Sequence, residues 1–562
     1  MSMLFRKKTI DKIIADSEAG LSDGHGGGHM NKVLGVKDLT FMGIAAVIGA
    51  GIFSTIGTAA FNGGPGISIL FIITAVTCGF SALCYAEFAS RVPIAGSAYT
   101  YAYVSFGEIV AWIIGWALIL EYAIGNIVVA ISWSGYFNNL LQGLGIHLPD
   151  WLVNDPFSVS SVVDDANKAI AAHQPLTDTM QAAIAAWGSA PIIFGKHFLI
   201  NLPALVIVVL ITILAYIGIK ESKKSTNFMV IFKIIVIILI IIIGSFYVNT
   251  GNWHPFMPNG FGGVLAGVSA VFYAYIGFDA ISTTAEECVN PQKDLPKGMI
   301  YSLVICTVLY ILIALVLTGM VHYSELKVND PLAYVFEKVH LPWIGYIISV
   351  SAVIATTSVL LVFQLGQPRI WMSMSRDGLL PKKFSEVHPK YQTPAFATIV
   401  TGFLVGIPSL FLPSSLMTDL TSIGTLFAFV LVCFGVLVLP KIQHNTKSAF
   451  RLPYINGKWI MPALTILITW AFHTRIFDAF TKVSTEGYQE LLFLVFMAIL
   501  VVVSILAFIR NYSVIPIIGA LCCLYLLTEI PAISWLWFFI WMGIGLVIYG
   551  VYGSKNSKLG KG

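Results

Sequence analysis

The chain has 562 residues, of which 57% are hydrophobic and only 11% are charged, and its formal net charge is +4. A water-soluble globular chain carries roughly 25% charged residues, so this composition excludes that class and predicts a polytopic protein embedded in a lipid bilayer. The net charge is too small to indicate a nucleic-acid partner.

Residues 1–38 precede the first apolar run. They hold an amphipathic stretch, in which Phe5 and its apolar neighbours oppose Lys8 and other basic residues, followed by a Gly-rich link. We expect this stretch to lie on the inner leaflet as an amphipathic helix. No short basic n-region precedes the first span, so we expect no signal peptide and a cytoplasmic N-terminus. Two histidines in the link, His25 and His29, are too few to indicate a metal site, and none is predicted.

Runs of about 18 to 25 apolar residues mark helices that can cross a bilayer. Fourteen such runs follow along the chain, near residues 39–60, 66–90, 99–137, 199–219, 226–248, 262–287, 299–321, 342–374, 394–413, 418–439, 460–480, 490–509, 513–529 and 532–552. The third and eighth runs are longer than a bilayer needs, so we expect those spans to tilt or protrude. The predicted fold class is therefore all-α, with about 14 spans.

The positive-inside rule tests this count independently of hydropathy. With a cytoplasmic N-terminus, 25 of the 32 Lys and Arg residues fall in cytoplasmic segments or at the inner ends of spans, and six fall outside. The remaining one, Lys233, lies deep within a span. The bias favours the fourteen-span topology, with both termini on the cytoplasmic side of the cell membrane.

The longest outer loop, residues 138–198, holds an amphipathic run near residues 166–187, so we expect it to form short helices that pack on the outer face. All seven cysteines fall in spans or at a cytoplasmic end. A second subunit linked through an outer-loop disulfide is therefore not expected.

Two apolar segments are interrupted in the same way. Ala45–Gly57 reads AAVIGAGIFSTIG, and residues 271–298 place Gly277 and an ionisable Asp279 at mid-membrane depth. A break at Ile48–Gly51, and another at Tyr275–Asp279, would expose backbone groups that hydrocarbon tolerates only where they face protein or a water-lined cavity. Two such segments, each opening one half of the hydrophobic array, indicate a substrate site between inverted repeats of a secondary transporter. The alternative is that the glycines only allow close helix packing.

Lys233 interrupts an otherwise apolar run with a charge that would cost roughly 2.5 to 3.5 kcal/mol at mid-bilayer. A buried lysine that alternates between its charged and neutral forms is a proton carrier, and we predict that role. The alternative is that its side chain reaches the inner end of the span, because Ser225 is only eight positions away.

Glu121 and Asp279 complete the charges inside spans, and such residues are functional candidates by default. For Asp279 we expect a contact with the substrate or a gate. Glu121 could bind a basic side chain, relay protons or pair with a tyrosine. For both, the plain alternative is a carboxyl group that bonds neighbouring backbone and steadies a broken helix.

Five segments together resemble the amino acid, polyamine and organocation superfamily, and within it the cationic amino acid transporter family. They are GIAAVIGAGIFSTIG, the LILEYAIGN run with Glu121, FKIIVIILIIIIG with Lys233, the broken segment through NPQKDLPKG, and LGQPRIWMSMSRDGLLP. The resemblance implies two inverted five-helix repeats with broken helices 1 and 6. The repeats would occupy residues 39–248 and 262–439, followed by four C-terminal spans in residues 460–552 and a tail at 553–562.

An amino acid needs hydrogen-bond donors for its carboxylate and acceptors for its ammonium group, and broken helices supply both from backbone. We expect N–H groups at Ala50 and Gly51, helped by Thr55, to hold the carboxylate, although the superfamily often has a hydroxyl residue in place of Ala50. The C=O groups of Val47, Tyr273 and Ile276 would accept from the ammonium. The family pattern also makes the Tyr273 ring a gate. The full predicted substrate set is Val47, Ile48, Ala50, Gly51, Thr55, Tyr273, Ile276 and Asp279.

In sodium-coupled relatives of this architecture a cation bridges spans 1 and 8, and the resemblance implies that the Lys233 ammonium takes that place. Its expected contacts are the C=O groups near Ala46 and Gly49 and hydroxyl groups among Thr356, Thr357 and Ser358. The predicted proton-coupling residues are therefore Lys233 and Glu121.

These observations predict a proton-coupled amino acid symporter that works by alternating access, with a small amino acid and a proton as its partners. An amino acid exchanger and a non-transporting amino acid receptor on the same fold are the alternatives. A channel would need a filter motif, and an enzyme would need a catalytic or phosphate-binding constellation; the sequence offers none of these, and no cofactor is predicted. Whether the substrate is a cationic or a small neutral amino acid stays open.

Overall fold

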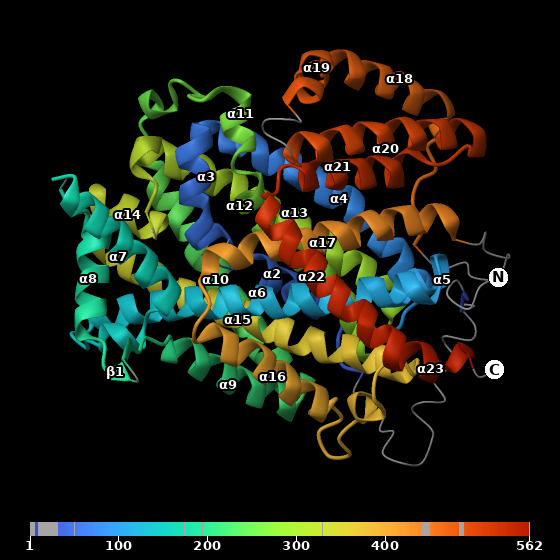
Figure 1. Cartoon of the computed structure of the whole chain (residues 1–562), viewed down its shortest axis with the longest axis horizontal. Helices are drawn as coiled ribbons and strands as arrows, with labels where there is room; N and C mark the ends of the chain where they lie inside the picture. The colour runs from blue at the N-terminus through green and yellow to red at the C-terminus, as the bar shows by residue number, and fades with distance from the viewer. Residues whose placement is uncertain are drawn as a thin grey trace.

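The computed structural model describes residues 6–8, 32–49, 51–173, 175–193, 195–328, 330–439, 450–482 and 488–560. Within them the regular structure is helical except for a two-stranded hairpin, β1 (Ile192–Ile193) and β2 (Lys196–His197). Most of the long helices lie side by side roughly along one common axis, as Figure 1 shows. An all-α membrane protein is confirmed.

The first half of the chain forms a bundle around one long helix. Its helices are α2 (Val36–Val47), α3 (Ile56–Gly63), α4 (Ile67–Arg91), α5 (Ala98–Ser105), α6 (Glu108–Gly143), α9 (Leu202–Ile217) and α10 (Ile219–Ser245). The most apolar 18-residue stretch of α6 is 94% buried inside the protein, whereas that of α10 is only 33% buried. α6 therefore lies at the centre of the bundle and α10 at its periphery.

The second half of the chain also begins with short helical pieces that form one broken span, and long helices follow. Its elements are α11 (Gly260–Leu265), α12 (Val268–Tyr273), the 3-10 helix η6 (Phe278–Glu287), α13 (Pro291–Met320), α14 (Pro331–Lys338), α15 (Pro342–Arg376), α16 (Ala395–Ser409) and α17 (Ser414–Val438). Three of the helices begin with proline, whose missing N–H is harmless in a first turn. The inverted relation between the two halves stays a prediction.

The C-terminal section comprises α18 (Gly457–Ala471), α19 (His473–Lys482), α20 (Tyr488–Arg510), α21 (Val514–Thr528), α22 (Ala532–Ile548) and α23 (Ser554–Asn556). α22 is fastened to α6 by two indole groups that bond each other's backbone. Trp116 Nε1 donates to the Trp541 carbonyl, Trp541 Nε1 donates to the Trp116 carbonyl, both at 2.9 Å, and the rings stack.

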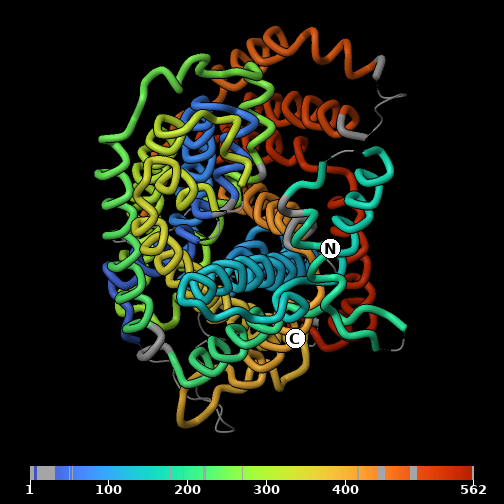
Figure 2. Tube along the Cα trace, turned by 90° about the vertical axis from the view of Figure 1, so that its left-hand side faces the viewer, coloured from blue at the N-terminus to red at the C-terminus, as the bar shows by residue number. Residues whose placement is uncertain are grey.

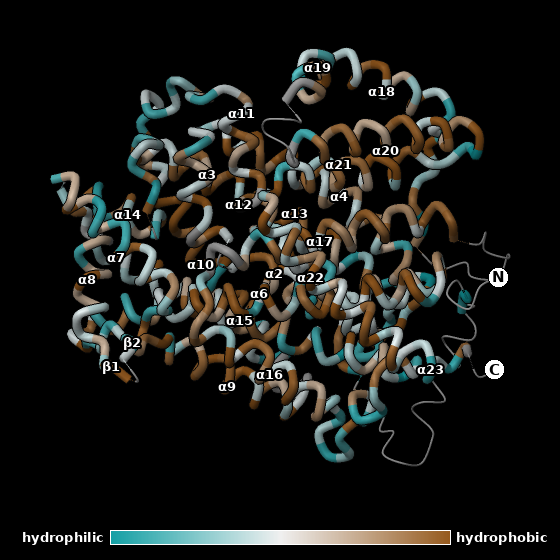
Figure 3. The backbone as a smooth tube through the Cα atoms, viewed as in Figure 1, coloured by the Kyte–Doolittle hydropathy of each residue, from teal (hydrophilic) through white to brown (hydrophobic). Residues whose placement is uncertain are grey.

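Nine helical stretches in the described residues are long and apolar enough to cross a membrane, and a tenth forms if α18 and residues 473–480 of α19, bent by 65°, make one span. The other predicted spans coincide with shorter helices, among them α9, α16 and α21. Figure 3 shows apolar residues along the lengths of the helices and polar residues gathered near their ends and in the loops. The total of about 14 spans stays a prediction.

The predicted third span, residues 99–137, is wrong as a single helix. The chain breaks at Phe106–Gly107 into the short helix α5 and the long helix α6, and Gly107 has φ +101°. That left-handed conformation is open to glycine at low cost, and hydropathy does not register it. α6 alone has 36 residues, so this span is longer than a bilayer needs, as its hydropathy predicted.

The outer loop forms two short helices, α7 (Pro156–Ala171) and α8 (Asp178–Ser189), as its amphipathic pattern predicted. In Figure 1 they lie at one end of the long helices, and α23 lies near the other. Figure 2 faces the end that carries α7 and α8. Two described residues near the chain termini also meet, because Arg6 Nη1 donates to the Leu559 carbonyl at 2.6 Å.

Candidate substrate and proton site

The first span breaks where the sequence predicted. α2 ends at Val47, Ile48 leaves the helical conformation with ψ +97°, and a π-helical turn, η2 (Gly51–Thr55), leads into α3. Ala50, a predicted substrate contact, lies outside the described residues. The Ile44 carbonyl still accepts from the Ile48 N–H at 3.0 Å, but the carbonyl groups after it have no further helical turn to bond, since the helix stops there.

The sixth span breaks in the same manner. α12 ends at Tyr273, Gly277 takes φ +114°, and η6 continues toward the charged loop. The Tyr273 carbonyl accepts a bond from the Ile276 N–H at 3.3 Å, within the turn. That carbonyl, a predicted acceptor for the ammonium group, thus keeps one of its two lone pairs free. The Tyr273 ring itself is buried.

The two breaks touch each other through positions that only glycine can fill. A Cβ atom on Gly51 would lie 2.5 Å from the Cα of Ala274, and one on Gly277 would lie 2.7 Å from the Cβ of Ala46. Both distances are far below van der Waals contact. Gly51 therefore faces the opposite break. This contact supports the interpretation that the glycines allow close packing, and the interpretation that they bind substrate stays a prediction.

Thr55 and Tyr310 bond the breaks together. The Thr55 hydroxyl donates to the Gly51 carbonyl at 2.6 Å and lies 3.1 Å from the Ala270 carbonyl. Its single proton is thus used on backbone here, and donation from Thr55 to a substrate carboxylate stays a prediction. The Tyr310 hydroxyl, from α13, reaches the carbonyls of Val47 and Ala274, at 2.8 and 2.9 Å.

Lys233 is completely buried and reaches across from α10 to the end of α2. Its Nζ donates to the Ile48 carbonyl at 2.7 Å, to the Ala45 carbonyl at 3.1 Å and to the Ser358 hydroxyl of α15 at 2.8 Å. Its side chain does not extend to the inner end of the span. The negative end of the α2 dipole favours the ammonium group at this place.

Ser358 is one of the three predicted hydroxyl groups, and the carbonyl acceptors lie near Ala46 and Gly49 but not at them. The carbonyl acceptors lie one residue before Ala46 and Gly49, and because successive residues on a helix are about 100° apart, a shift of one residue selects a different face. Thr356 and Thr357 do not contact the lysine. Their hydroxyls donate to the carbonyls of Ala352 and Val353, each at 2.7 Å within α15.

Glu121 and Asp279 are buried with almost no exposure, and the described residues provide no cation to pair with either. Oε2 of Glu121 and both Asp279 oxygens lack hydrogen-bond partners there. Backbone N–H groups, among them that of Gly277, lie near Asp279 without forming a hydrogen bond to it. The other Glu121 oxygen faces the Thr425 hydroxyl.

Two tyrosines share this region, and we call Glu121, Asp279, Tyr85 and Tyr122 the carboxyl cluster. The Tyr85 and Tyr122 hydroxyls are buried without partners among the described residues, and both lie within electrostatic range of the two carboxyl groups. Buried polar atoms are almost always hydrogen-bonded in proteins. Four side chains with unmet hydrogen-bonding capacity therefore mark a place for water, a proton or a polar part of a substrate.

Ion pairs join the end of the second broken span to α15. Arg369 of α15 forms two bonds with the Glu287 carboxylate, at 2.7 and 2.9 Å, and Arg376 bonds Glu286 at 2.8 Å. Asp377 accepts from Lys8 and from the Tyr99 hydroxyl. These bonds tie η6 to α15 and both to the segment before α6.

Sequence reasoning missed Tyr310 and the two cluster tyrosines. In a hydropathy profile a tyrosine inside a span reads as an apolar residue, so its hydroxyl passes unnoticed. A search for tyrosines on spans that neighbour a broken helix would have found all three, because a buried hydroxyl needs a partner.

Comparison with known proteins decides the family. Residues 34–477, more than half of the chain, match the family described as amino acid permease, and residues 512–557 match the C-terminal region of that family. The chain belongs to the amino acid permease family.

Relatives of this permease cover it from end to end. The branched-chain amino acid permease BcaP of Bacillus subtilis is 39% identical over 99% of both chains, and the methylthioribose transporter of the same organism is 36% identical over the whole of both. Cationic amino acid transporter 3, mitochondrial, of Arabidopsis thaliana is 30% identical over 99% of this chain and 95% of its own. The permease is thus a multi-pass membrane transporter, similar to the cationic amino acid transporters, and not an enzyme.

Proposed function

We propose that this permease is a secondary amino acid transporter that imports its substrate together with a proton, and that Lys233 carries the proton. The observation that supports the proposal is the setting of the Lys233 ammonium group. It is completely buried, its three partners are neutral oxygens, and no carboxylate pairs with it among the described residues. For a buried ammonium group without a counter-charge, the free-energy difference between the charged and neutral forms is small, so the proton can be lost.

Loss of that proton would act directly on the broken span. The charged ammonium attracts the carbonyl end of α2, and a neutral amine attracts it much less. Release of Ile48 and Ala45 from Lys233 would loosen the first break from α10 and α15. The protonation state of one side chain would thus bias the position of span 1, which is the coupling that a symporter requires.

The substrate would bind where the two breaks meet. The N–H groups at the start of η2 suit a carboxylate, and the free lone pairs on the Val47 and Tyr273 carbonyls suit an ammonium group. The carboxyl cluster would receive the side chain or relay the proton. The names of the relatives range from branched-chain and cationic amino acids to methylthioribose, so identity alone does not select a side chain. A thermal-shift screen against the twenty amino acids would, because binding raises stability by RT ln(1 + [L]/Kd).

Uptake by proteoliposomes tests the coupling. An inward proton gradient should drive accumulation without sodium, and Lys233→Met should abolish that accumulation while binding partly survives. Lys224→Met is the matched control, since Lys224 lies on the same helix but is exposed. A requirement for sodium in the native protein, or undiminished concentration of substrate by Lys233→Met, would contradict the proposal.

An exchanger and a receptor remain the alternatives. An exchanger would take up labelled substrate only when the vesicle interior holds unlabelled substrate, whatever the proton gradient. A receptor would bind an amino acid in the thermal-shift screen and show no uptake in either arrangement.

A further inference from the structure

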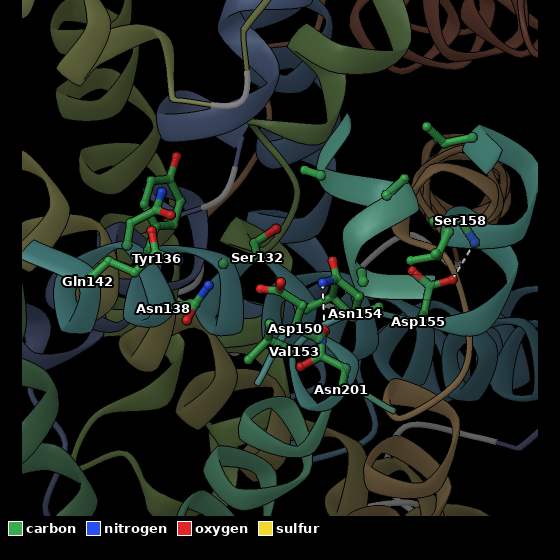
Figure 4. A pocket seen from close by; sticks show the side chains of 18 of the residues that line it. Ser132, Tyr136, Asn138, Gln142, Asp150, Val153, Asn154, Asp155, Ser158 and Asn201 are labelled. Atoms are coloured by element: carbon green, nitrogen blue, oxygen red, sulfur yellow. Dashed lines mark hydrogen bonds between the residues drawn. The ribbon is translucent and has the colours of Figure 1, made fainter. Parts of the chain in front are cut away.

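A cavity of about 750 Å³ lies at the outer end of α6, beneath α7 and α8. Its walls come from segments that are far apart in the sequence, and Figure 4 shows most of its lining side chains. They include Asn138 and Asn139 of α6, Asp150 of the 3-10 turn η4 (Asp150–Leu152), Asp155 before α7, and Asp330 before α14. Only a folded outer loop brings these polar groups around one space.

The lining offers hydrogen-bond acceptors. Asp155 is only 8% exposed, and one of its oxygens accepts from the Ser158 N–H at 2.8 Å, a bond that Figure 4 shows. Oδ1 of Asn138 is buried without a partner among the described residues. The described residues that line the cavity include no Lys, Arg or His. A ligand that fits this wall must bring donors and positive charge.

Asp330 adds to the negative charge. Burial raises the pKa of Asp330 to about 6, against the opposing bond that its carboxylate accepts from the Ala333 N–H. At neutral pH the group is therefore ionised. Three carboxylates then face a partly enclosed space, and low-dielectric walls concentrate their field.

Size and spacing exclude a bound metal ion as the occupant. No group of three His, Cys, Asp or Glu side chains stands close enough to hold a metal among the residues that the structure describes. Cavities of 300 to 1,000 Å³ hold small organic molecules. An organic cation with N–H donors, such as an amine, meets both conditions.

The cavity also adjoins the broken first span. Tyr136 lines it, and the Tyr136 ring meets the Phe53 ring of η2 edge-on, with 6.4 Å between centroids. Phe53 follows the break by a few residues, so one aromatic pair separates the cavity from the segment that would hold the substrate. We propose that this cavity is an outer vestibule that captures positively charged amines before they reach the breaks. That the amines pass on to the breaks rests on the proposed function, whereas their capture in the cavity does not.

A thiol placed in the cavity tests the capture directly. Asn139 is exposed and lines the cavity, so Asn139→Cys can be modified from outside with a methanethiosulfonate that carries a trimethylammonium group or with neutral methyl methanethiosulfonate. We expect the ratio of the cationic to the neutral rate to fall by about threefold or more when Asp155 and Asp330 become Asn, since local charge changes encounter rates by this order or more. Asparagine caps a helix as well as aspartate does, so the fold is kept.

The control removes the same number of negative charges from α7 outside the cavity. Asp164 and Asp165 of α7 are exposed and do not line the cavity, so Asp164→Asn with Asp165→Asn should leave the ratio unchanged. The parent without Asn139→Cys gives the background of the native thiols. Each of Asp155→Asn and Asp330→Asn alone should give part of the effect, which keeps the test valid if the double variant folds poorly. An unchanged ratio in all of them would overturn the vestibule.

Transport separates this inference from the proposed function. The Vmax/KM for lysine uptake should fall by about threefold to tenfold in the Asp155→Asn, Asp330→Asn variant at low ionic strength, and the loss should shrink in strong salt, which screens the charges. Leucine uptake should change less. If the native protein imports no amino acid while the thiol ratio falls as expected, the vestibule stands and the proposed function fails. If uptake is normal and neither readout changes, the vestibule fails alone.

Discussion

The hydroxyl group of Tyr310 lies 2.8 Å from the carbonyl oxygen of Val47, the last residue of α2. The same hydroxyl lies 2.9 Å from the Ala274 carbonyl in the other break, and it has one proton to share between the two. α13 thereby joins the broken spans. Each carbonyl keeps a second lone pair, so an ammonium group can bond Val47 while Tyr310 stays in place.

Replacing Tyr310 with Phe should weaken substrate binding about fivefold to tenfold, because a lost hydrogen bond is worth about 1 kcal/mol and leaves two buried carbonyls short of a donor. The melting temperature of the purified protein should fall as well. Tyr301→Phe, the same change at an exposed position of α13, should alter neither quantity. Equal behaviour of the two variants would mean that the Tyr310 hydroxyl holds nothing together.

Ser358→Ala should impair gradient-driven uptake, because it removes one of three acceptors from the Lys233 ammonium, and bonds to charged groups are worth about 1.5 to 3 kcal/mol. The measurement is the ratio of internal to external substrate at a fixed proton gradient. Thr356→Val is the matched control, since that hydroxyl bonds only its own helix. A greater loss in Thr356→Val than in Ser358→Ala would contradict the observed register.

Gly51→Val should lower the yield of folded protein, because the added atoms would collide with Ala274. A binding assay of that variant would therefore report on folding as well as on the site. Gly277→Ala should be harmed twice, by its contact with Ala46 and by a left-handed conformation that costs other residues about 1 to 2 kcal/mol. Gly79→Ala, with open space around it, should fold normally. Size-exclusion profiles and melting curves in detergent distinguish the three.

Arg369→Met should destabilise the protein by about 3 to 5 kcal/mol, because it leaves the buried Glu287 carboxylate without its partner. The double variant Arg369→Met, Glu287→Leu should recover much of the loss. Lys338→Met, which breaks an exposed pair with Glu325, should melt like the parent. The prediction fails if the double variant is less stable than Arg369→Met alone.

Labelling of single cysteines tests the orientation in the membrane. Lys383→Cys, in the exposed loop after α15, should react with an impermeant thiol reagent only from the cytoplasmic side. Lys168→Cys, on α7, should react only from outside. Reaction of both from the same side in intact cells would overturn the topology.

The sequence predicts features that depend on local composition and misses those that depend on register. Glycines and an isolated Asp279 located both breaks, and the amphipathic run of the outer loop located α7 and α8. The contact of Lys233 with Ser358, and not with its neighbours Thr356 and Thr357, depends on how α10 and α15 are rotated against each other. Packing of whole helices sets that rotation, and no single segment encodes it.

The reciprocal indole bonds between Trp116 and Trp541 limit the parts that can move separately. The two reciprocal hydrogen bonds and the stacked rings fix both the spacing and the rotation of α22 on α6. Trp112 adds a third hydrogen bond, to the Gly545 carbonyl at 2.9 Å. If α6 belongs to a stationary frame during transport, α22 is part of that frame; if α6 rocks, it carries α22 through the surrounding lipid. In either case these bonds make α22 move together with α6.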